Sequence, residues 1–429
     1  MTQPSGWTGT DRLLLGVALC ATLLRFAYPF FAHPLDFLFS DPLRHWQNAE
    51  RFFAPDLMSA MDPPVYQLWL RGVRALAGAE NRGGLSALQG LLCAVTPWGY
   101  AAALREAGTR QRWTLVALVV LALHPSLWAI YRFFMIETLL LPLTGLALWA
   151  SVAAWRRAHG GLFLLAVLLW TLAVLTKSTV APAALVSLAF AWWRLPARIP
   201  AAILAAALAA LMVVPAGLRT QATLGSFEPT GSPWISRLYH VSDTRMIRFS
   251  WGNRAHYDFA SPAMFDPVFA PFSDWTPADS RQNFAASFRF DPALRLLDVR
   301  AAIAHDTRTP ERQAMMALEN AAVLLFGHSW PDNNPDRLED RLTMALRWLW
   351  ASAIVALAAG AAAQFRRSRA DPIVVAATAM TLALLLQPVF TVEGRYRKPL
   401  EPFVILGLVR LAGTRPRTRD PQNDDLPRL

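Results

Sequence analysis

The sequence predicts an all-α protein that crosses a membrane about nine or ten times, because of its composition and its long apolar runs. Hydrophobic residues make up 54% of the 429 positions and charged residues only 17%, whereas about a quarter of the residues in a soluble domain are charged. Several apolar runs reach the roughly 20 residues needed to cross the hydrocarbon core of a bilayer. These observations exclude a disordered or fibrous chain and argue against a single soluble domain.

The apolar runs define ten candidate spans. The first is too long and too aromatic for a cleaved signal peptide, and no small-residue cleavage site follows it, so we expect it to be retained. The candidate spans are 13–31, 86–104, 114–131, 137–154, 161–177, 179–193, 199–217, 343–363, 372–390 and 399–412. Two of them, 179–193 and 399–412, are short, so a count of nine is an open alternative.

Arginine clusters in the short loops predict the orientation. The net charge is +11, but the arginines gather between spans rather than on a phosphate-binding face, so no nucleic-acid partner is expected. Basic loops follow spans two, four, six, eight and ten: Arg105, Arg110, Arg112, Arg156, Arg157, Arg194, Arg198, Arg366, Arg367, Arg369, Arg415, Arg417 and Arg419. By the positive-inside rule, this side, which is also that of the N-terminus, is the cytoplasm. The Ala-, Arg- and Leu-rich composition suggests a bacterium, and hence a multi-pass inner (plasma) membrane protein with both termini in the cytoplasm.

Two long polar segments then face away from the cytoplasm. The first, 32–84, lies within an N-terminal transmembrane region (1–217), and its apolar residues have helical spacing: Trp46, Ala49, Phe52, Phe53, Val65, Leu68, Trp69 and Val73. Such spacing beside arginines predicts amphipathic helices in the membrane interface. The second segment, 218–342, is expected to be irregular with a few helices, such as Arg312–Phe326. A C-terminal transmembrane region (343–412) and a polar cytoplasmic tail (413–429) complete the predicted organisation.

Ionisable residues at the outer ends of spans are the candidates for chemistry, because a charge at membrane depth is costly. Asp41, in Ser40-Asp41-Pro42, follows the first span directly. Its position is typical of a helix cap and equally of a functional acid at the membrane boundary. The sequence leaves both readings open.

A very short outer turn carries Arg132 and Glu137 between spans three and four. The spacing favours a pair that anchors the turn over a substrate-binding role. Lys177 follows span five, where it would either reach the headgroups or supply a cation for a phosphate. Both readings of Lys177 stay open.

A basic cluster lies between spans nine and ten, in Glu393-Gly-Arg395-Tyr396-Arg397-Lys398-Pro399. Positive charge on the outer side runs against the positive-inside rule and calls for an anionic partner. Phospholipid headgroups are one such partner. The violation of the rule favours a phosphate-bearing substrate.

The sequence shows no convincing metal site. Six histidines lie in the two predicted outer segments, and no two of them have metal-ligand spacing such as His-x-x-x-His. The two cysteines, Cys20 and Cys93, both lie within predicted spans and indicate neither a disulfide framework nor a metal cluster.

In this order, these motifs resemble the GT-C superfamily of membrane glycosyltransferases, and most nearly its branch related to protein O-mannosyltransferases and the lipid A aminoarabinose transferase. The resemblance covers about residues 12–412. The residues that match the family pattern are Asp41 after the first span, Asp62-Pro63-Pro64-Val65-Tyr66, Arg132 with Glu137, Leu175-x-Lys177-x-Thr179, and Arg395-Tyr396-Arg397-Lys398-Pro399 with Pro402.

The resemblance implies a GT-C-like helix bundle that transfers a sugar, with inversion, from a polyprenyl-phosphate donor to an acceptor outside the cytoplasm. Asp41 would act as general base and Glu137 as a second catalytic acid residue that shapes the site. The implied substrate-binding residues are Tyr66, Arg132, Lys177, Arg395, Tyr396 and Arg397. The superfamily also allows a divalent metal. Membrane lipids and a cell-envelope glycan, lipid or protein acceptor are the expected partners.

Two other classes compete with this interpretation. A transporter or flippase for a lipid-linked saccharide would carry polar residues inside several spans, whereas the spans here are mostly apolar in their middles. A non-catalytic membrane scaffold is distinguished by Asp41, because a scaffold should tolerate Asp41→Asn.

Overall fold

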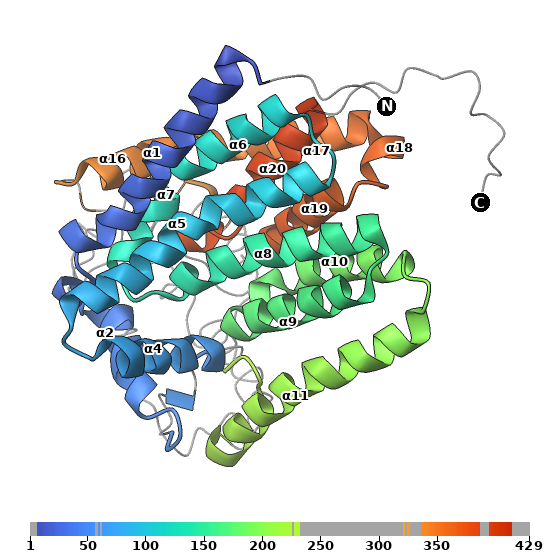
Figure 1. Cartoon of the computed structure of the whole chain (residues 1–429). Coiled ribbons are helices and arrows are strands. Elements are labelled where there is room, and N and C mark those ends of the chain that lie inside the picture. The colour runs from blue at the N-terminus through green and yellow to red at the C-terminus, as the bar shows by residue number, and fades with distance from the viewer. Residues whose placement is uncertain are drawn as a thin grey trace, which may run out of the picture.

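The computed structural model describes residues 7–55, 59–60, 62–224, 227–231, 321, 324–326, 334, 336–386 and 394–413. Every regular element in these residues is a helix, which confirms the predicted all-α class. The longer helices form one bundle, in which segments from both ends of the chain lie side by side (Figure 1).

The helices of the bundle follow the predicted spans closely. They are α1 (Gly9–Phe31), α5 (Arg82–Glu106), α6 (Gln111–Leu123), α7 (Ser126–Ala129), α8 (Ile136–Arg157), α9 (Gly160–Thr176), α10 (Ala181–Trp193), α11 (Arg198–Leu224), α16 (Leu338–Leu346), α17 (Leu349–Ala363), α19 (Pro372–Leu386) and α20 (Glu401–Gly413). Short helices connect several of them: η1 (Pro34–Phe37), η2 (Ile130–Arg132), η3 (Ser178–Val180), α18 (Phe365–Ser368) and η9 (Gly394–Arg397).

The bundle has the character of a membrane protein. Four of the described helices are long and apolar enough to cross a bilayer, or up to six if each bent pair is one span. On α11, Ile199, Leu211 and Leu218 point outward with more than half of their surface exposed. Exposing such a row of apolar side chains is unfavourable in water, whereas contact with lipid tails is not. The chain is therefore an all-α polytopic membrane protein, as predicted, while the count of nine or ten spans stays a prediction.

Glycines set the closest helix crossings. A Cβ placed on Gly99 of α5 would lie 3.0 Å from the backbone of Gly145 on α8, so the two helices touch through their backbones there. On the other side of α5, a Cβ on Gly90 would lie 2.2 Å from the carbonyl oxygen of Phe26 on α1. Small residues at helix crossings are typical of membrane bundles, where close packing replaces the hydrophobic effect.

A buried arginine, which the sequence analysis did not single out, holds α1 against its neighbours. Arg25 is 1% exposed. Its guanidinium donates to the carbonyl oxygens of Cys93 (2.7 Å), Leu121 (3.4 Å), Ala122 (3.3 Å) and Leu127 (2.7 Å). A carbonyl in an α-helix normally accepts from the N–H four residues on. Pro97 and Pro125 have no N–H, so the carbonyls of Cys93 and Leu121 lack that partner, and Arg25 replaces it.

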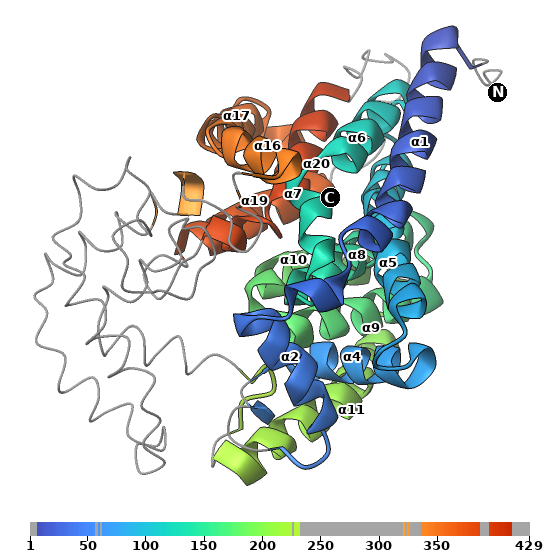
Figure 2. The same ribbon diagram turned by 90° about the vertical axis from the view of Figure 1, so that its left-hand side faces the viewer.

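The first outer segment contains two helices, α2 (Ser40–Glu50) and α4 (Pro64–Ala77), which confirms its predicted helical character. Both lie at one end of the bundle in each view (Figures 1 and 2). The apolar residues of α4 are not all buried. Tyr66, Leu70 and Val73 are buried, whereas Leu68 is exposed.

The C-terminal part of α11 also holds this segment. Arg219 donates to the carbonyl oxygens of Phe52 (3.2 Å) and Ser59 (2.9 Å), and to the side chain of Gln67 (3.0 Å). The predicted second outer segment, 218–342, lies mostly outside the described residues, as does most of the predicted helix 312–326. The helix α16 begins at the end of this segment.

Candidate active site

A polar stripe on α2 carries the predicted base. Asp41, Arg44, His45 and Asn48 lie three, four and seven residues apart, so they share one helix face. Nη1 of Arg44 lies 2.8 Å from Oδ1 of Asp41, and Nε of the same guanidinium lies 3.1 Å from Oδ1 of Asp62. One cation therefore stands between two carboxylates.

The structure decides against the helix-cap reading of Asp41. The residue before α2 is Phe39, which makes no capping hydrogen bond through its side chain, and Asp41 lies inside the first turn. A carboxylate there is stabilised by the helix dipole as well as by Arg44. The cation beside Asp41 favours the ionised carboxylate, which is the form that accepts a proton.

Asp62 is the hub of this cluster. Besides Arg44, it accepts hydrogen bonds from Nδ1 of His45 (3.1 Å) and Nδ2 of Asn48 (2.7 Å), and it is 4% exposed. Burial pushes the pKa of Asp62 up, but Arg44, His45 and Asn48 outweigh it and lower the pKa to about 2. An ionised carboxylate only accepts, so Nδ1 of His45 carries the hydrogen of this bond.

Tyr66 joins this cluster to the start of α8. Its ring lies edge-on to His45 at 5.3 Å and is fully buried. Burial raises the pKa of the Tyr66 hydroxyl well above its ordinary value, against the opposing effect of Thr138, and the carboxylates of Glu137 and Asp62 raise it further. Tyr66 therefore lies within the electrostatic reach of both Asp62 and Glu137.

A second cluster brings together three predicted site residues from separate parts of the chain. Nζ of Lys177, at the end of α9, lies 2.8 Å from Oε1 of Glu137 at the start of α8. The same ammonium group lies 4.4 Å from the ring centroid of Tyr396 on η9, a cation–π contact. The Lys177 side chain is 13% exposed, whereas that of Glu137 is 2% exposed. Lys177 is thus the accessible member of a buried pair.

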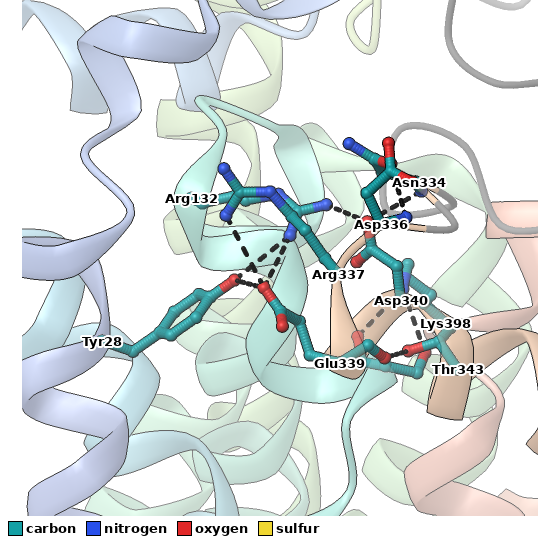
Figure 3. Close-up of polar contacts among 10 residues, drawn as sticks. Tyr28, Arg132, Asn334, Asp336, Arg337, Glu339, Asp340, Thr343 and Lys398 are labelled. Atoms are coloured by element: carbon teal, nitrogen blue, oxygen red, sulfur yellow. Dashed lines mark hydrogen bonds and ion pairs between the residues drawn. The ribbon is translucent and has the colours of Figure 1, made fainter.

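Arg132 forms its ion pairs with other residues than Glu137, the partner that its spacing in the sequence favoured. Its guanidinium binds Glu339 (2.9 Å) and Asp340 of α16 and lies 3.3 Å from the hydroxyl of Tyr28, as Figure 3 shows. Glu137 pairs with Lys177 instead. Since Arg132 is 1% exposed, it ties α16 to the turn before α8. The acidic pair Glu339-Asp340 lies more than 200 residues away in sequence, and no local spacing could have identified it.

Two residues of the basic cluster before α20, Arg397 and Lys398, are buried. Arg397 is buried against Glu401, with Nε 3.0 Å from Oε1, and donates to the carbonyl oxygen of Leu324 at 2.8 Å. Lys398 is fully buried and donates to Ser126 through both the carbonyl oxygen (2.9 Å) and Oγ (3.0 Å). These bonds anchor η9, which carries Tyr396. The side chain of Arg395 lies outside the described residues.

The described residues do not fit a metal cofactor. They contain no group of three or more His, Cys, Asp and Glu side chains that would hold an ion.

Comparison with known proteins gives one family match, which covers part of the chain. Residues 61–218 match the model of the dolichyl-phosphate-mannose-protein mannosyltransferase family. The matched stretch is less than half of the chain; it contains Asp62, Tyr66, Arg132, Glu137 and Lys177, whereas Asp41 and Tyr396 lie beyond it. No curated protein matches the chain, and no solved structure matches it. The family match, together with the helical membrane fold, supports a membrane glycosyltransferase of the GT-C type.

Proposed function

We propose that this protein transfers a sugar, with inversion, from a polyprenyl-phosphate donor to an acceptor on the outer side of a bacterial inner membrane. The single observation that carries the proposal is the meeting of Glu137, Lys177 and Tyr396, from three separate segments, at the bundle end that also holds Asp41. The proposed orientation, with both termini in the cytoplasm, rests on the positive-inside distribution of arginine.

The proposed reaction needs a base and a cation. An acceptor hydroxyl attacks the anomeric carbon, its proton passes to the Asp41 carboxylate, and the bond from that carbon to the phosphate oxygen breaks. The electron pair leaves with the phosphate. Lys177 stabilises this developing charge, because an ammonium group near a leaving oxygen acts most strongly in a site shielded from water. Glu137 fixes the position of Lys177.

The residues expected to bind substrate have different roles in this proposal. The ring of Tyr396 contacts the Lys177 ammonium group. Tyr66, on α4, packs against His45 and lies between the two clusters. Arg395 is proposed as a further phosphate ligand because it adjoins Tyr396 in sequence. The guanidinium groups of Arg132 and Arg397 bind buried acids, so the proposed role of both arginines is to stabilise the structure around the site.

The test is sugar transfer from a panel of radiolabelled polyprenyl-phosphate sugars in membranes that contain the protein. Release of free polyprenyl phosphate by the wild type, and its loss in Asp41→Asn, is the expected result. If well-folded protein supplied with envelope acceptors releases no polyprenyl phosphate from any donor, the proposal fails and a transporter or scaffold takes its place.

A further inference from the structure

We propose that Asp62 is a positioning residue that sets the basicity of Asp41 through the arginine they share. The inference rests on the proposed role of Asp41 as the base of sugar transfer, but its geometry stands by itself. Arg44 bridges the two carboxylates at 2.8 Å and 3.1 Å, so the charge of Asp62 determines how much of the guanidinium charge acts on Asp41.

Besides Arg44, two other side chains hold the negative charge of Asp62. His45 and Asn48 both donate to Oδ2, while Arg44 is bound to Oδ1. Both donors come from α2, and the three bonds fix the segment before α4 against the helix that carries Asp41. Asp62 thus fixes the geometry of the stripe and adds a permanent negative charge to it.

Several other charged residues near α2 are bound to partners of their own. On α2 and α4, Arg74 binds Glu50, and Arg71 donates to the backbone oxygen of Glu50. On α8, Glu137 binds Lys177. On η1, Asp36 binds Arg82. Among the described residues, Arg44 contacts Asp41 directly, and Asp62 contacts both Arg44 and His45, so a change of charge at Asp62 reaches Asp41 through Arg44.

The sign of the effect follows from elementary electrostatics. A second carboxylate on the same cation disfavours ionisation of the first, because like charges repel and the cation is shared. Neutralising Asp62 removes the repulsion and leaves the whole charge of Arg44 to Asp41. Asp41 then holds its proton less strongly and becomes a weaker base.

A direct measurement is the pH dependence of carbodiimide labelling at Asp41, because carbodiimides react with protonated carboxyl groups. Full-length protein in detergent is labelled at a series of pH values, and the peptide that contains Asp41 is quantified by mass spectrometry. We expect Asp62→Asn to move the labelling midpoint down by about one pH unit. Asp62→Glu, which keeps the charge, should restore most of the difference, and Asn48→Ala, which removes a hydrogen bond but no charge, should leave the midpoint nearly unchanged.

An unchanged or higher midpoint in Asp62→Asn overturns the inference. If this variant does not fold, Arg44→Gln is labelled instead. It should raise the midpoint, and an unchanged value again overturns the inference. The acid limb of the transfer rate should move with the labelling midpoint. If the wild type transfers no sugar but the midpoint shifts as expected, the proposed function fails while the electrostatic role of Asp62 stands.

Discussion

The ammonium group of Lys177 lies 2.8 Å from the carboxylate of Glu137, although 40 residues separate them in sequence. The pair joins the end of α9 to the start of α8 and leaves the lysine partly exposed beneath Tyr396. The lysine is the more exposed member of the pair, and its ammonium group also contacts the ring of Tyr396.

Lys177→Met is expected to weaken use of the lipid-linked donor by about 10- to 100-fold in kcat/KM, since a charged hydrogen bond contributes roughly 1.5–3 kcal/mol. The natural control is the other lysine of this region, Lys398, which is fully buried against Ser126. Both variants should lower the thermal unfolding midpoint, because each leaves a buried polar group without its lysine partner, so the donor kinetics separate the two roles. Equal donor kinetics for Lys177→Met and the wild type would refute the phosphate-binding role.

Asp41→Asn is expected to abolish transfer while membrane expression and the unfolding midpoint stay close to the wild-type values. The amide keeps the size of the side chain but cannot accept a proton as a base. Asp36→Asn is a suitable control, because Asp36 is an exposed acid in the same outer segment that pairs with Arg82. Activity of Asp41→Asn at the level of this control would remove Asp41 from the mechanism.

Arg25→Met is expected to destabilise the protein by about 3 kcal/mol or more, because four backbone carbonyls lose a charged donor inside the bundle. Thermal unfolding in detergent measures the effect. Adding Pro97→Ala to Arg25→Met should recover part of the loss, since the introduced alanine would supply the N–H that the Cys93 carbonyl lacks. A double variant no more stable than Arg25→Met would contradict this account of the arginine.

Gly99→Ala and Gly90→Ala should each lower the unfolding midpoint, because the added Cβ meets backbone atoms at 3.0 Å and 2.2 Å. Gly72→Ala is the matched control, since nothing lies within 4 Å of its Cβ position. There the substitution should be neutral or stabilise α4 by about 0.5–1 kcal/mol. If all three variants unfold alike, the close crossings of α5 are not essential to the bundle.

The charge of Asp62 predicts a window of acid sensitivity. Its pKa in the folded protein is about 2, against an ordinary value of 3.8. The stabilisation from this group is therefore complete above about pH 4 and is lost as the pH falls towards 2, a change of about 2 kcal/mol. Unfolding midpoints of the wild type and Asp62→Asn should converge across this window. Parallel curves would mean that Asp62 is not the group responsible.

Much of the fold followed from the sequence because apolar length and arginine placement are local properties. Each predicted span coincides with one helix or one bent pair, and the break in the third span falls at His124-Pro125, between α6 and α7. The two helices of the first outer segment were likewise readable from residue spacing. Their buried faces were not, because Leu68 and Leu70 differ only in which neighbour they meet.

The sequence by itself determined the all-α membrane class, most of the helices and the set of candidate polar residues near their ends. Only the tertiary structure decided which of those residues meet. It paired Glu137 with Lys177 rather than with Arg132, gave Arg132 to Glu339 and Asp340, and made Asp62 the partner of Arg44. The physical reason is that hydropathy acts residue by residue along the chain. A charge, in contrast, pairs with whatever the packing of distant helices brings within about 3 Å.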